Sequence, residues 1–382
     1  MKVLIVPDKF KGTLTAPAAA AAIAAGWRRP RGRDTLELLP MSDGGDGFGE
    51  VLGELLGARA EVTVTVDATH EPRRARWWWE PKSRTAVIES AEVVGLAQLR
   101  GRKYDPLEVD TFGLGVVLQS AARAGAERCL VGVGGSATNE GSFGLARSLG
   151  WKFLDRQRQP IRRWTRLTNL ERLEPPEHRL RFGELVVAVD VQNPLLGPRG
   201  CTRIYGPQKG LREVDYYPVE KCLARLAAVV KKSLKRDLGR VAGSGAAGGL
   251  GFGLCAFLGA RLEPGFALFA RYAGLEERLR GADLVITAEG SIDRSTVMGK
   301  GVGEVARLCG QAHVPCLGLA GRLDLDPRRD SAAVALARQR FTRLEGIAPA
   351  LATIEEAKAQ PGRWLTDLAA RMAAEWAGRQ RH

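Results

Sequence analysis

Residues 130–141 read LVGVGGSATNEG, and the interpretation of the whole chain depends on this stretch. The apolar run 129–133 predicts a buried strand, two glycines break it, and an apolar-periodic helix is expected over 143–149. A glycine-rich turn between a strand and a helix presents backbone N–H groups and the positive end of the helix to an anion. Ser136, Thr138 and Asn139 add neutral polar side chains, and the loop has no lysine. The stretch predicts either a site for phosphate or polyol oxygens or an ordinary loop whose Ser or Thr caps the helix.

The composition is that of a globular protein with an unusual charge. The 382 residues are enough for two domains, and 45% of them are hydrophobic. The formal net charge is +14, and most of the positive charge comes from arginines scattered along the chain. No RNP, zinc-finger or helix-turn-helix pattern accompanies them. We therefore expect a surface that favours anionic small molecules, and no nucleic-acid partner.

The cysteine pattern and the apolar runs bear on the cellular setting. Six cysteines form no C-x-x-C pair and only four histidines are present, so neither a zinc site nor a disulfide framework is predicted. An apolar strand begins at the second residue, which leaves no room for a leader peptide. No run of about eighteen apolar residues is present. We expect a cytoplasmic protein, monomeric or homodimeric, that has no membrane partner.

The first strand leads directly into a charged turn. The continuous apolar run 3–6 is followed by Asp8, Lys9 and Lys11. In open α/β sheets the ligands bind at the carboxyl ends of the strands. Two lysines beside one aspartate can hold phosphate oxygens as point charges, so this turn is a candidate phosphate site.

Further strands end in acidic or glycine-rich turns. The runs 36–39, 185–189 and 283–287 lead to Asp43 and Asp46, to Asp190, and to Glu289 and Asp293, respectively. Such carboxylates can hold Mg²⁺ or orient and deprotonate a hydroxyl group, and solvated acidic turns are the alternative. Lys209 lies in a tight polar turn, and residues 243–251 form a second glycine-rich loop that opens a helix.

The hydrophobic pattern changes near residue 67 and changes back near residue 283. Residues 61–66, 76–80 and 85–88 alternate with period two, which predicts strands of an antiparallel or mixed sheet. The runs 3–6 and 283–287 are continuous and apolar, as in parallel sheets covered on both faces. The three consecutive tryptophans at 77–79 are expected to pack within a strand. The pattern predicts an α/β fold with two domains, residues 1–66 with 283–382 and an inserted mixed α/β domain over 67–282.

Phosphoryl transfer requires carboxylates for Mg²⁺, cations on the transferred phosphate and an acid that orients the acceptor hydroxyl. The strand ends described above supply all three kinds of group. The chain has no Walker loop, no protein-kinase signature set and no G-x-G-x-x-G after its first strand, which argues against P-loop enzymes, protein kinases and dinucleotide oxidoreductases. No histidine lies near the serine-bearing loops to suggest a hydrolase triad.

Six blocks of the sequence, taken in order, resemble the bacterial glycerate kinases that are neither protein-kinase-like nor P-loop enzymes. They are residues 7–16 (PDKFKGTLTA), 40–47 (PMSDGGDG), 134–139 (GGSATN), 206–210 (GPQKG), 245–251 (GAAGGLG) and 289–293 (EGSID). The resemblance implies phosphorylation of D-glycerate with ATP and Mg²⁺. It also implies that the site lies in a cleft between a flavodoxin-like or Rossmann-like parallel-sheet domain, built from both chain ends, and an inserted domain.

The resemblance and the strand ends together suggest roles for individual residues. Asp190 or Asp43 is expected to orient or deprotonate the hydroxyl, with Lys11 on phosphate and 2-phosphoglycerate as product. Glu289 and Asp293 are expected to hold Mg²⁺. The residues expected to bind glycerate or ATP, with the division between the two ligands left open, are Asp8, Lys9, Gly44, Gly45, Gly134, Gly135, Ser136, Thr138, Asn139, Lys209, Gly248 and Gly249. The alternatives are a kinase for another small hydroxy acid or polyol acid, and a nucleotide- or anion-responsive binding protein.

Overall fold

The computed structural model describes residues 1–297, 299–326, 328 and 330–379. The chain forms two compact units, Met1–Asp43 with Phe266–His382 and Gly44–Gly265. The boundaries therefore lie at 43/44 and 265/266, whereas the sequence pattern predicted 66/67 and 282/283. The first difference arises because the strand at 59–66 pairs within the second unit. The alternating pattern of 61–66 belonged to the inserted sheet and not to the chain end.

The first unit is built on a five-stranded parallel sheet. Its strands are β1 (Lys2–Pro7), β2 (Thr35–Leu38), β11 (Leu284–Asp293), β12 (Cys316–Asp324) and β13 (Arg343–Ala348), in the order β13-β12-β11-β1-β2. Numbered within this unit, the order is 2-1-3-4-5, one of the two common doubly wound arrangements and the flavodoxin-like one. All four residues of the apolar run 3–6 are fully buried, as a sheet covered on both faces requires.

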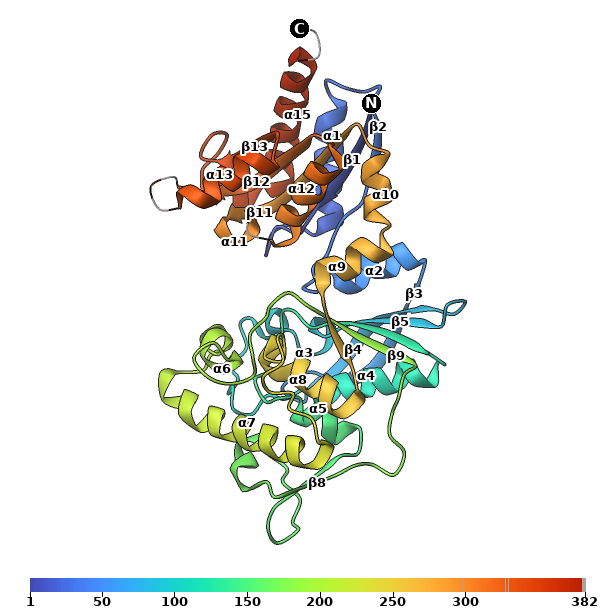
Figure 1. Ribbon diagram of the computed structural model, residues 1–382, viewed down its shortest axis with the longest axis vertical. Helices are drawn as coiled ribbons and strands as arrows, with labels where there is room; N and C mark the ends of the chain where they lie inside the picture. The colour runs from blue at the N-terminus through green and yellow to red at the C-terminus, as the bar shows by residue number, and fades with distance from the viewer. Residues whose placement is uncertain (298, 327, 329, 380–382) are drawn as a thin grey trace. The chain divides into compact units, whose positions relative to one another are not determined.

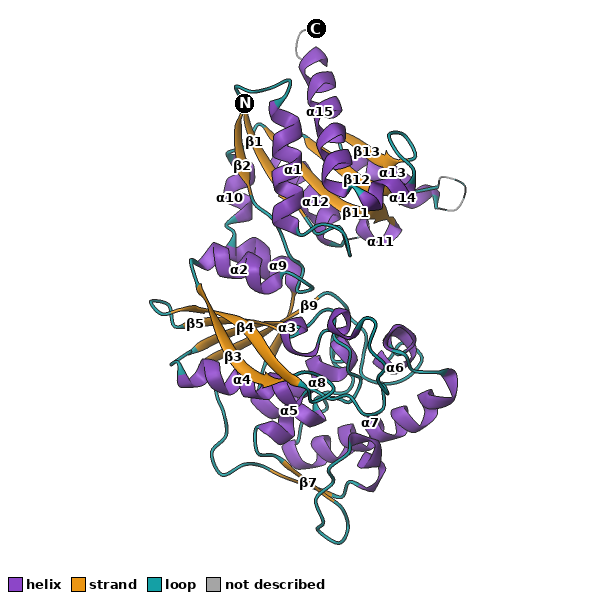
Figure 2. Cartoon of the chain, turned by 180° about the vertical axis from the view of Figure 1, so that it is seen from behind, coloured by secondary structure: helices purple, strands orange, loops and turns teal. Residues whose placement is uncertain are grey.

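Helices cover both faces of this sheet (Figures 1 and 2). Ile23 and Trp27 of α1 share a buried cluster with Leu365 and Leu368 of α15 and with alternate residues of the central strands, while α12 covers the other face. The helices of this unit are α1 (Ala16–Arg28), α9 (Gly265–Tyr272), α10 (Leu275–Arg280), α11 (Arg294–Val297), α12 (Gly301–Ala312), α13 (Ser331–Arg340), α14 (Ile354–Ala359) and α15 (Pro361–Arg379).

The second unit contains a mixed six-stranded sheet in the order β10-β9-β6-β5-β4-β3. Its strands are β3 (Arg59–Val66), β4 (Pro72–Glu80), β5 (Thr85–Glu89), β6 (Arg128–Gly132), β9 (Glu184–Val189) and β10 (Arg261–Pro264), and β7 (Lys152–Leu154) pairs separately with β8 (Arg172–Glu174). Within the six-stranded sheet, β5, β6, β9 and β10 run parallel to one another, whereas β4 is antiparallel to both of its neighbours, β3 and β5. This agrees with the antiparallel or mixed sheet predicted from the alternation.

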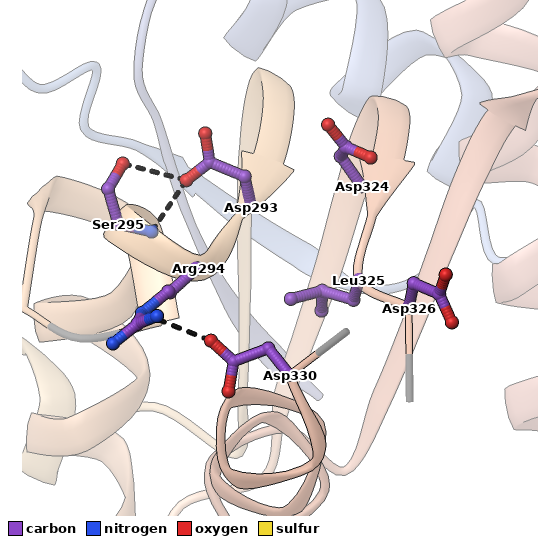
Figure 3. Close-up of a pocket in the computed structure, with 7 residues that line it drawn as sticks. All are labelled: Asp293, Arg294, Ser295, Asp324, Leu325, Asp326 and Asp330. Carbon is purple, nitrogen blue, oxygen red and sulfur yellow. Dashed lines mark hydrogen bonds and ion pairs between the residues drawn. The ribbon is translucent and has the colours of Figure 1, made fainter. Parts of the chain in front are cut away.

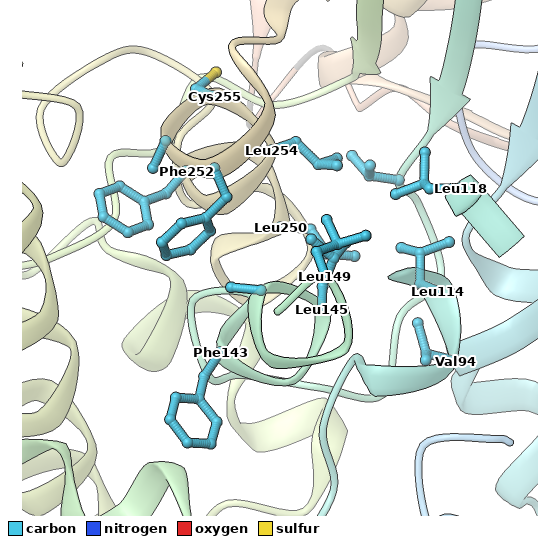
Figure 4. Packing of buried hydrophobic residues seen from close by; sticks show 14 of the residues in the cluster. Val94, Leu114, Leu118, Phe143, Leu145, Leu149, Leu250, Phe252, Leu254 and Cys255 are labelled. Atoms are coloured by element: carbon cyan, nitrogen blue, oxygen red, sulfur yellow. The ribbon is translucent and has the colours of Figure 1, made fainter. Parts of the chain in front are cut away.

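Three helices meet in the main core of this unit. Leucines of α4 (Phe112–Arg123), α5 (Phe143–Ser148) and α8 (Ala246–Leu258) gather at the centre of this core, as Figure 4 shows. The remaining helices and 3₁₀ turns are α2 (Phe48–Leu56), α3 (Ala91–Val94), α6 (Cys201–Tyr205), α7 (Glu213–Leu234), η1 (Leu96–Leu99), η2 (Trp164–Asn169) and η3 (Pro207–Lys209).

The alternation along β3 is the reverse of the usual one. Thr63 and Thr65 face the interior, and Val62 and Val64 are 48% and 70% exposed. Buried hydroxyls require partners. Thr63 accepts a hydrogen bond of 3.1 Å from the indole nitrogen of Trp77, and Thr65 donates one of 2.9 Å to the carbonyl of Gly113. Period two thus predicted the strand correctly, but the hydrophobic side was not the buried side.

Candidate functional site

Charged residues of the first unit gather at the carboxyl edge of its sheet. Asp8 follows β1, Asp43 follows β2, and Glu289 lies in β11, and these three strands are neighbours. The Nζ atom of Lys9 is 3.5 Å from Oδ1 of Asp43 and 3.8 Å from Oδ1 of Asp8. Parallel strands bring their carboxyl ends to one edge, which is why residues separated by more than 240 positions meet here. Four of the predicted site residues are therefore in one cluster.

Two carboxyl groups of this cluster hold protons unusually strongly. Burial raises the pKa of Glu289 to about 8, against a hydrogen bond from Thr296, and the charges of Asp8, Asp293 and Asp43 add to the effect. Burial also raises the pKa of Asp8 to about 6, where Lys9 opposes the shift and Asp43 adds to it. The Oε1 atom of Glu289 is buried without a hydrogen-bond partner in the described part of the chain. A buried acceptor of this kind suits a cation or a donor from a ligand.

Asp293 faces a different environment from Glu289. Its Oδ1 accepts hydrogen bonds from the backbone and side chain of Ser295, both at 2.7 Å, and so it caps the short helix α11. It lines an acidic pocket with Asp324, Asp326 and Asp330, and Arg294 pairs with Asp330 at 3.0 Å (Figure 3). Burial alone would raise the pKa of Asp293, but the hydrogen bonds from Ser295 and Thr296 outweigh it and lower the pKa.

Metal-binding geometry is limited in the described residues. Among residues 1–297, 299–326, 328 and 330–379, no group of three or more His, Cys, Asp or Glu side chains is arranged to hold an ion. Lys11, the third charged residue of the first turn, is exposed. The first unit thus brings Asp8, Lys9, Asp43 and Glu289 together and directs Asp293 to the neighbouring pocket.

Two glycine-rich turns of the second unit pack backbone against backbone. The N–H of Gly134 donates a 3.0 Å hydrogen bond to the carbonyl of Gly44. A Cβ atom at Gly134 would lie 2.4 Å from Cα of Gly45, and one at Gly135 would lie 2.2 Å from Oδ1 of Asp46. Only glycine permits this approach, so the pairs 44–45 and 134–135 depend on each other for their close contact.

The loop at 136–139 is held by Lys209 and by the start of α8. The Nζ atom of Lys209 donates to Oγ of Ser136 at 3.0 Å and to the carbonyl of Thr138 at 2.7 Å. Ser136 in turn donates to the carbonyl of Ala247 at 3.0 Å. A Cβ atom at Gly248 would lie 2.0 Å from the carbonyl oxygen of Thr138. The predicted residues Ser136, Thr138, Lys209, Gly248 and Gly249 are therefore brought together, although Lys209 is buried and engaged inside the protein.

Unpartnered polar atoms remain in this loop. Oγ1 of Thr138 and Oδ1 of Asn139 are buried and have no hydrogen-bond partner in the described part of the chain, while Nδ2 of Asn139 donates to Thr202 at 3.0 Å. Neither Ser136 nor Thr138 caps α5, which begins only at Phe143. The alternative in which a Ser or Thr of this stretch caps the helix is therefore wrong, because α5 has no side-chain cap hydrogen bond.

Glu140 and Lys209 are buried ionisable groups behind this loop. Glu140 accepts hydrogen bonds from Oγ1 of Thr111 at 2.7 Å and from the N–H of Gly144 at 2.9 Å. Burial raises the pKa of Glu140 to about 8, and Asp110 adds to the effect. Burial lowers the pKa of Lys209 to about 8. Burial therefore moves the two pKa values toward each other from opposite sides.

Asp190 and Asn193 lie near the end of β9 in different environments. Asp190 follows β9 and is exposed. The amide of Asn193 is used internally, because its Oδ1 accepts from the hydroxyl of Tyr205 at 2.6 Å and its Nδ2 donates to the carbonyl of Arg199 at 2.7 Å. Of the two, Asp190 is the one whose side chain faces solvent.

Glu89 is a candidate residue that was not predicted from the sequence. It ends β5, it is buried, and its carboxylate accepts hydrogen bonds from the N–H groups of Gly47 and Gly49, each at 3.0 Å. The rule that selected Asp8, Asp43, Asp190 and Glu289, an acid at the end of an apolar strand, applies to Glu89 as well.

Comparisons with known proteins identify the family. The sequence profile of the Glycerate kinase family matches residues 3–377. The chain belongs to the glycerate kinase family. It is 36% identical to a glycerate kinase of Halalkalibacterium halodurans over 324 residues, which cover 84% of this chain and 85% of that protein. It is 37% identical to a glycerate 2-kinase of Escherichia coli over 333 residues, 85% of this chain and 86% of that one.

A solved structure extends the similarity to the fold. The crystal structure of a candidate glycerate kinase 2 from Salmonella typhimurium LT2 matches with a TM-score of 0.84 and 32% identity, and the match covers all of both chains. This member of the glycerate kinase family is therefore an enzyme, a kinase, with a mixed α/β fold. None of the helices in the described part of the chain combines the length and apolar character needed to cross a membrane.

Proposed function

We propose that this glycerate kinase family member transfers the γ-phosphate of ATP to D-glycerate, and that the product is 2-phosphoglycerate. Beyond the family, the observation that supports the proposal is the cluster of Asp8, Lys9, Asp43 and Glu289, in which Glu289 has a buried oxygen without a partner. Phosphoryl transfer needs cations on the phosphate and carboxylates for metal and acceptor, and the cluster has both kinds of group.

The residues fit a metal ion that arrives with its nucleotide. Mg²⁺ is usually held by one or two carboxylates together with substrate phosphates and waters. Glu289 offers one unpartnered oxygen, and Asp293, which lines the neighbouring pocket, is the second carboxylate that we propose for the ion. When bound, Mg²⁺ neutralises the charge that develops on the transferred phosphoryl group. Glu289 would give up its proton as its oxygen becomes a ligand, because a metal ligand must be deprotonated.

The remaining residues divide between binding and proton transfer. Asp43 or Asp190 orients the acceptor hydroxyl or accepts its proton, and Lys9 and Lys11 contact phosphate oxygens. The amide and hydroxyl groups of the 134–139 loop offer neutral hydrogen bonds to glycerate or to the triphosphate, and Oγ1 of Thr138 is available for one of them. Lys209 holds that loop from inside.

The test is an assay of ADP release with ATP, Mg²⁺ and D-glycerate, followed by phosphorus NMR of the product. We expect turnover and a single product phosphorylated at the 2-hydroxyl. ADP release with related hydroxy acids but not with D-glycerate would overturn the substrate assignment. Thermal stabilisation by ATP without turnover would instead indicate a binding protein.

A further inference from the structure

Glu89 holds the first turn of α2 from the end of a neighbouring strand. Its Oε1 accepts a hydrogen bond from the N–H of Gly47, and its Oε2 accepts one from the N–H of Gly49. Gly47 is the N-cap residue of α2 and has a φ of 88°, and it has no side chain with which to cap the helix. A carboxylate at a helix N-terminus satisfies free N–H groups and interacts favourably with the helix dipole. Glu89 thus supplies the cap that α2 lacks.

This contact fixes a turn that matters for the site. Residues 44–47 make the glycine-to-glycine contact with residues 134 and 135, and they carry Asp46. Asp43 directly precedes them in the chain. Farther along α2, Gly49 and Gly53 leave no room for a Cβ atom against the ring of Trp78. The helix is therefore in contact with Trp78 on one side and is capped by Glu89 at its beginning.

We propose that Glu89 is a positioning residue for the kinase reaction, which sets the turn 44–47 by holding two of the backbone N–H groups at its end. This inference rests on the proposed function, because it assumes that the segment at 43–46 takes part in phosphoryl transfer. Glu89 touches neither substrate in this role. It acts through Gly47 and Gly49.

The pKa of the Glu89 carboxyl group lies near neutral pH. Burial raises its pKa to about 7, the hydrogen bonds from Gly49 and Gly47 oppose the shift, and the charges of Glu92 and Asp46 add to it. Arg76 of β4 pairs with Glu92 at 2.6 Å, and the charge of Glu89 makes a smaller contribution to the raised pKa of Arg76. Only the ionised carboxylate can accept both hydrogen bonds without a competing proton, so the grip on the turn weakens as the pH falls below 7.

The test compares Glu89→Gln with Thr353→Ala. The glutamine has nearly the same volume but can accept only one of the two hydrogen bonds. Thr353 caps α14 through a side-chain bond to the N–H of Glu356, so its removal is a matched loss of a helix cap away from the turn. We measure steady-state constants for ATP and D-glycerate between pH 5.5 and 8.5, and amide hydrogen exchange of the peptide 44–52.

We expect Glu89→Gln to lower kcat by about tenfold or more with KM nearly unchanged, since small displacements of a reacting group cost rate. The ratio of wild-type to variant kcat should rise with pH through about 7, and exchange in residues 44–52 should accelerate. Thr353→Ala should change none of these. Faster exchange with unchanged kcat would overturn the positioning role and leave only a structural cap, and unchanged exchange would overturn the contact itself.

A wild-type protein without glycerate kinase activity is a separate outcome. It would refute the proposed function and with it the catalytic part of this inference. The exchange measurement would still report on the contact between Glu89 and the turn.

Discussion

The Nζ atom of Lys209 lies 2.7 Å from the carbonyl oxygen of Thr138, and only 2% of Lys209 is exposed. A lysine in a polar turn would ordinarily be expected to face solvent or a ligand. Here the ammonium group joins Ser136 and Thr138 and determines the shape of the loop that carries them. In the function that we propose, Lys209 therefore supports binding indirectly, through the shape of this loop.

Lys209→Met should destabilise the protein and lower the affinity for the ligand that we propose for the 134–139 loop. The substitution leaves a buried carbonyl and a hydroxyl without their donor, which costs about 1–3 kcal/mol of unfolding free energy. Urea denaturation and the two KM values measure the effects. Lys231→Met is the control, because Lys231 forms an exposed ion pair with Asp237 whose loss should change stability little. Equal effects of the two substitutions would contradict the internal role of Lys209.

Gly248→Ala should be far more damaging than Gly259→Ala. Both glycines have a φ of 73°, so both alanines carry the cost of the left-handed conformation, about 1–2 kcal/mol. The Cβ of an alanine at 248 would also lie 2.0 Å from the carbonyl oxygen of Thr138, whereas nothing lies within 4 Å at 259. We expect only Gly248→Ala to raise KM for a substrate, and its loss of unfolding free energy should exceed that of Gly259→Ala in urea denaturation. Equal losses would contradict the close approach.

Glu140 should make stability depend on pH. Its pKa is about 8 in the folded protein and near 4.5 when unfolded, so the folded state binds an additional proton between these values. The unfolding free energy therefore falls as the pH rises from about 4.5 to 8, by an amount on the order of a few kcal/mol. In Glu140→Gln this part of the decline should be absent, while the parts due to Asp8, Glu89 and Glu289 remain. Parallel stability curves for both proteins would refute this.

Glu289→Gln should weaken the use of Mg²⁺–ATP. The amide cannot provide a charged ligand, so we expect the Mg²⁺ concentration that gives half-maximal rate to rise by about tenfold or more. The proton released by the wild-type protein on binding Mg²⁺–ATP near pH 7.5 should also be lost, which calorimetry in two buffers detects. Glu276→Gln, which changes an exposed acid of α10 paired with Arg280, is the control. A variant with unchanged Mg²⁺ dependence would remove Glu289 from the metal site.

We expect that either Asp43→Asn or Asp190→Asn removes most of the turnover. Loss of the group that receives the hydroxyl proton lowers kcat by about 10²–10⁴-fold, with a smaller effect on KM. Rapid-quench measurement of the chemical step distinguishes this from slower product release. If both single variants and the double alanine variant keep wild-type kcat, neither residue is the catalytic acid–base group.

Several features of the fold and site could be predicted from the sequence. Continuous apolar runs such as 3–6 identify strands of a covered parallel sheet, and parallel strands place their carboxyl ends together. That is why Asp8, Asp43 and Glu289 could be selected as candidates before the fold was known. The glycine pairs 44–45 and 134–135 were likewise found by pattern, although their contact with each other could not be.

Other features depend on tertiary contacts that a local pattern does not contain. The strand β3 was assigned to the wrong unit, because alternation shows a strand but not its partner, and its threonines proved to face the interior. The burial of Lys209 follows from Ser136 and Thr138, which lie more than 70 residues earlier in the chain. The role of Glu89 required the positions of two backbone N–H groups some 40 residues before it.

The second unit interrupts the sequence of the first, between strands of the first unit's sheet, and this has a consequence for biosynthesis. Residues 44–265 are continuous and can pack as they emerge, but Val3 of β1 pairs with β11 at Leu284. At typical translation rates, roughly 15–60 seconds separate the synthesis of these two residues. Throughout that interval the nascent chain carries the apolar strand β1 with its β11-facing edge unpaired, although its other edge can pair with β2 as soon as residues 35–38 are made.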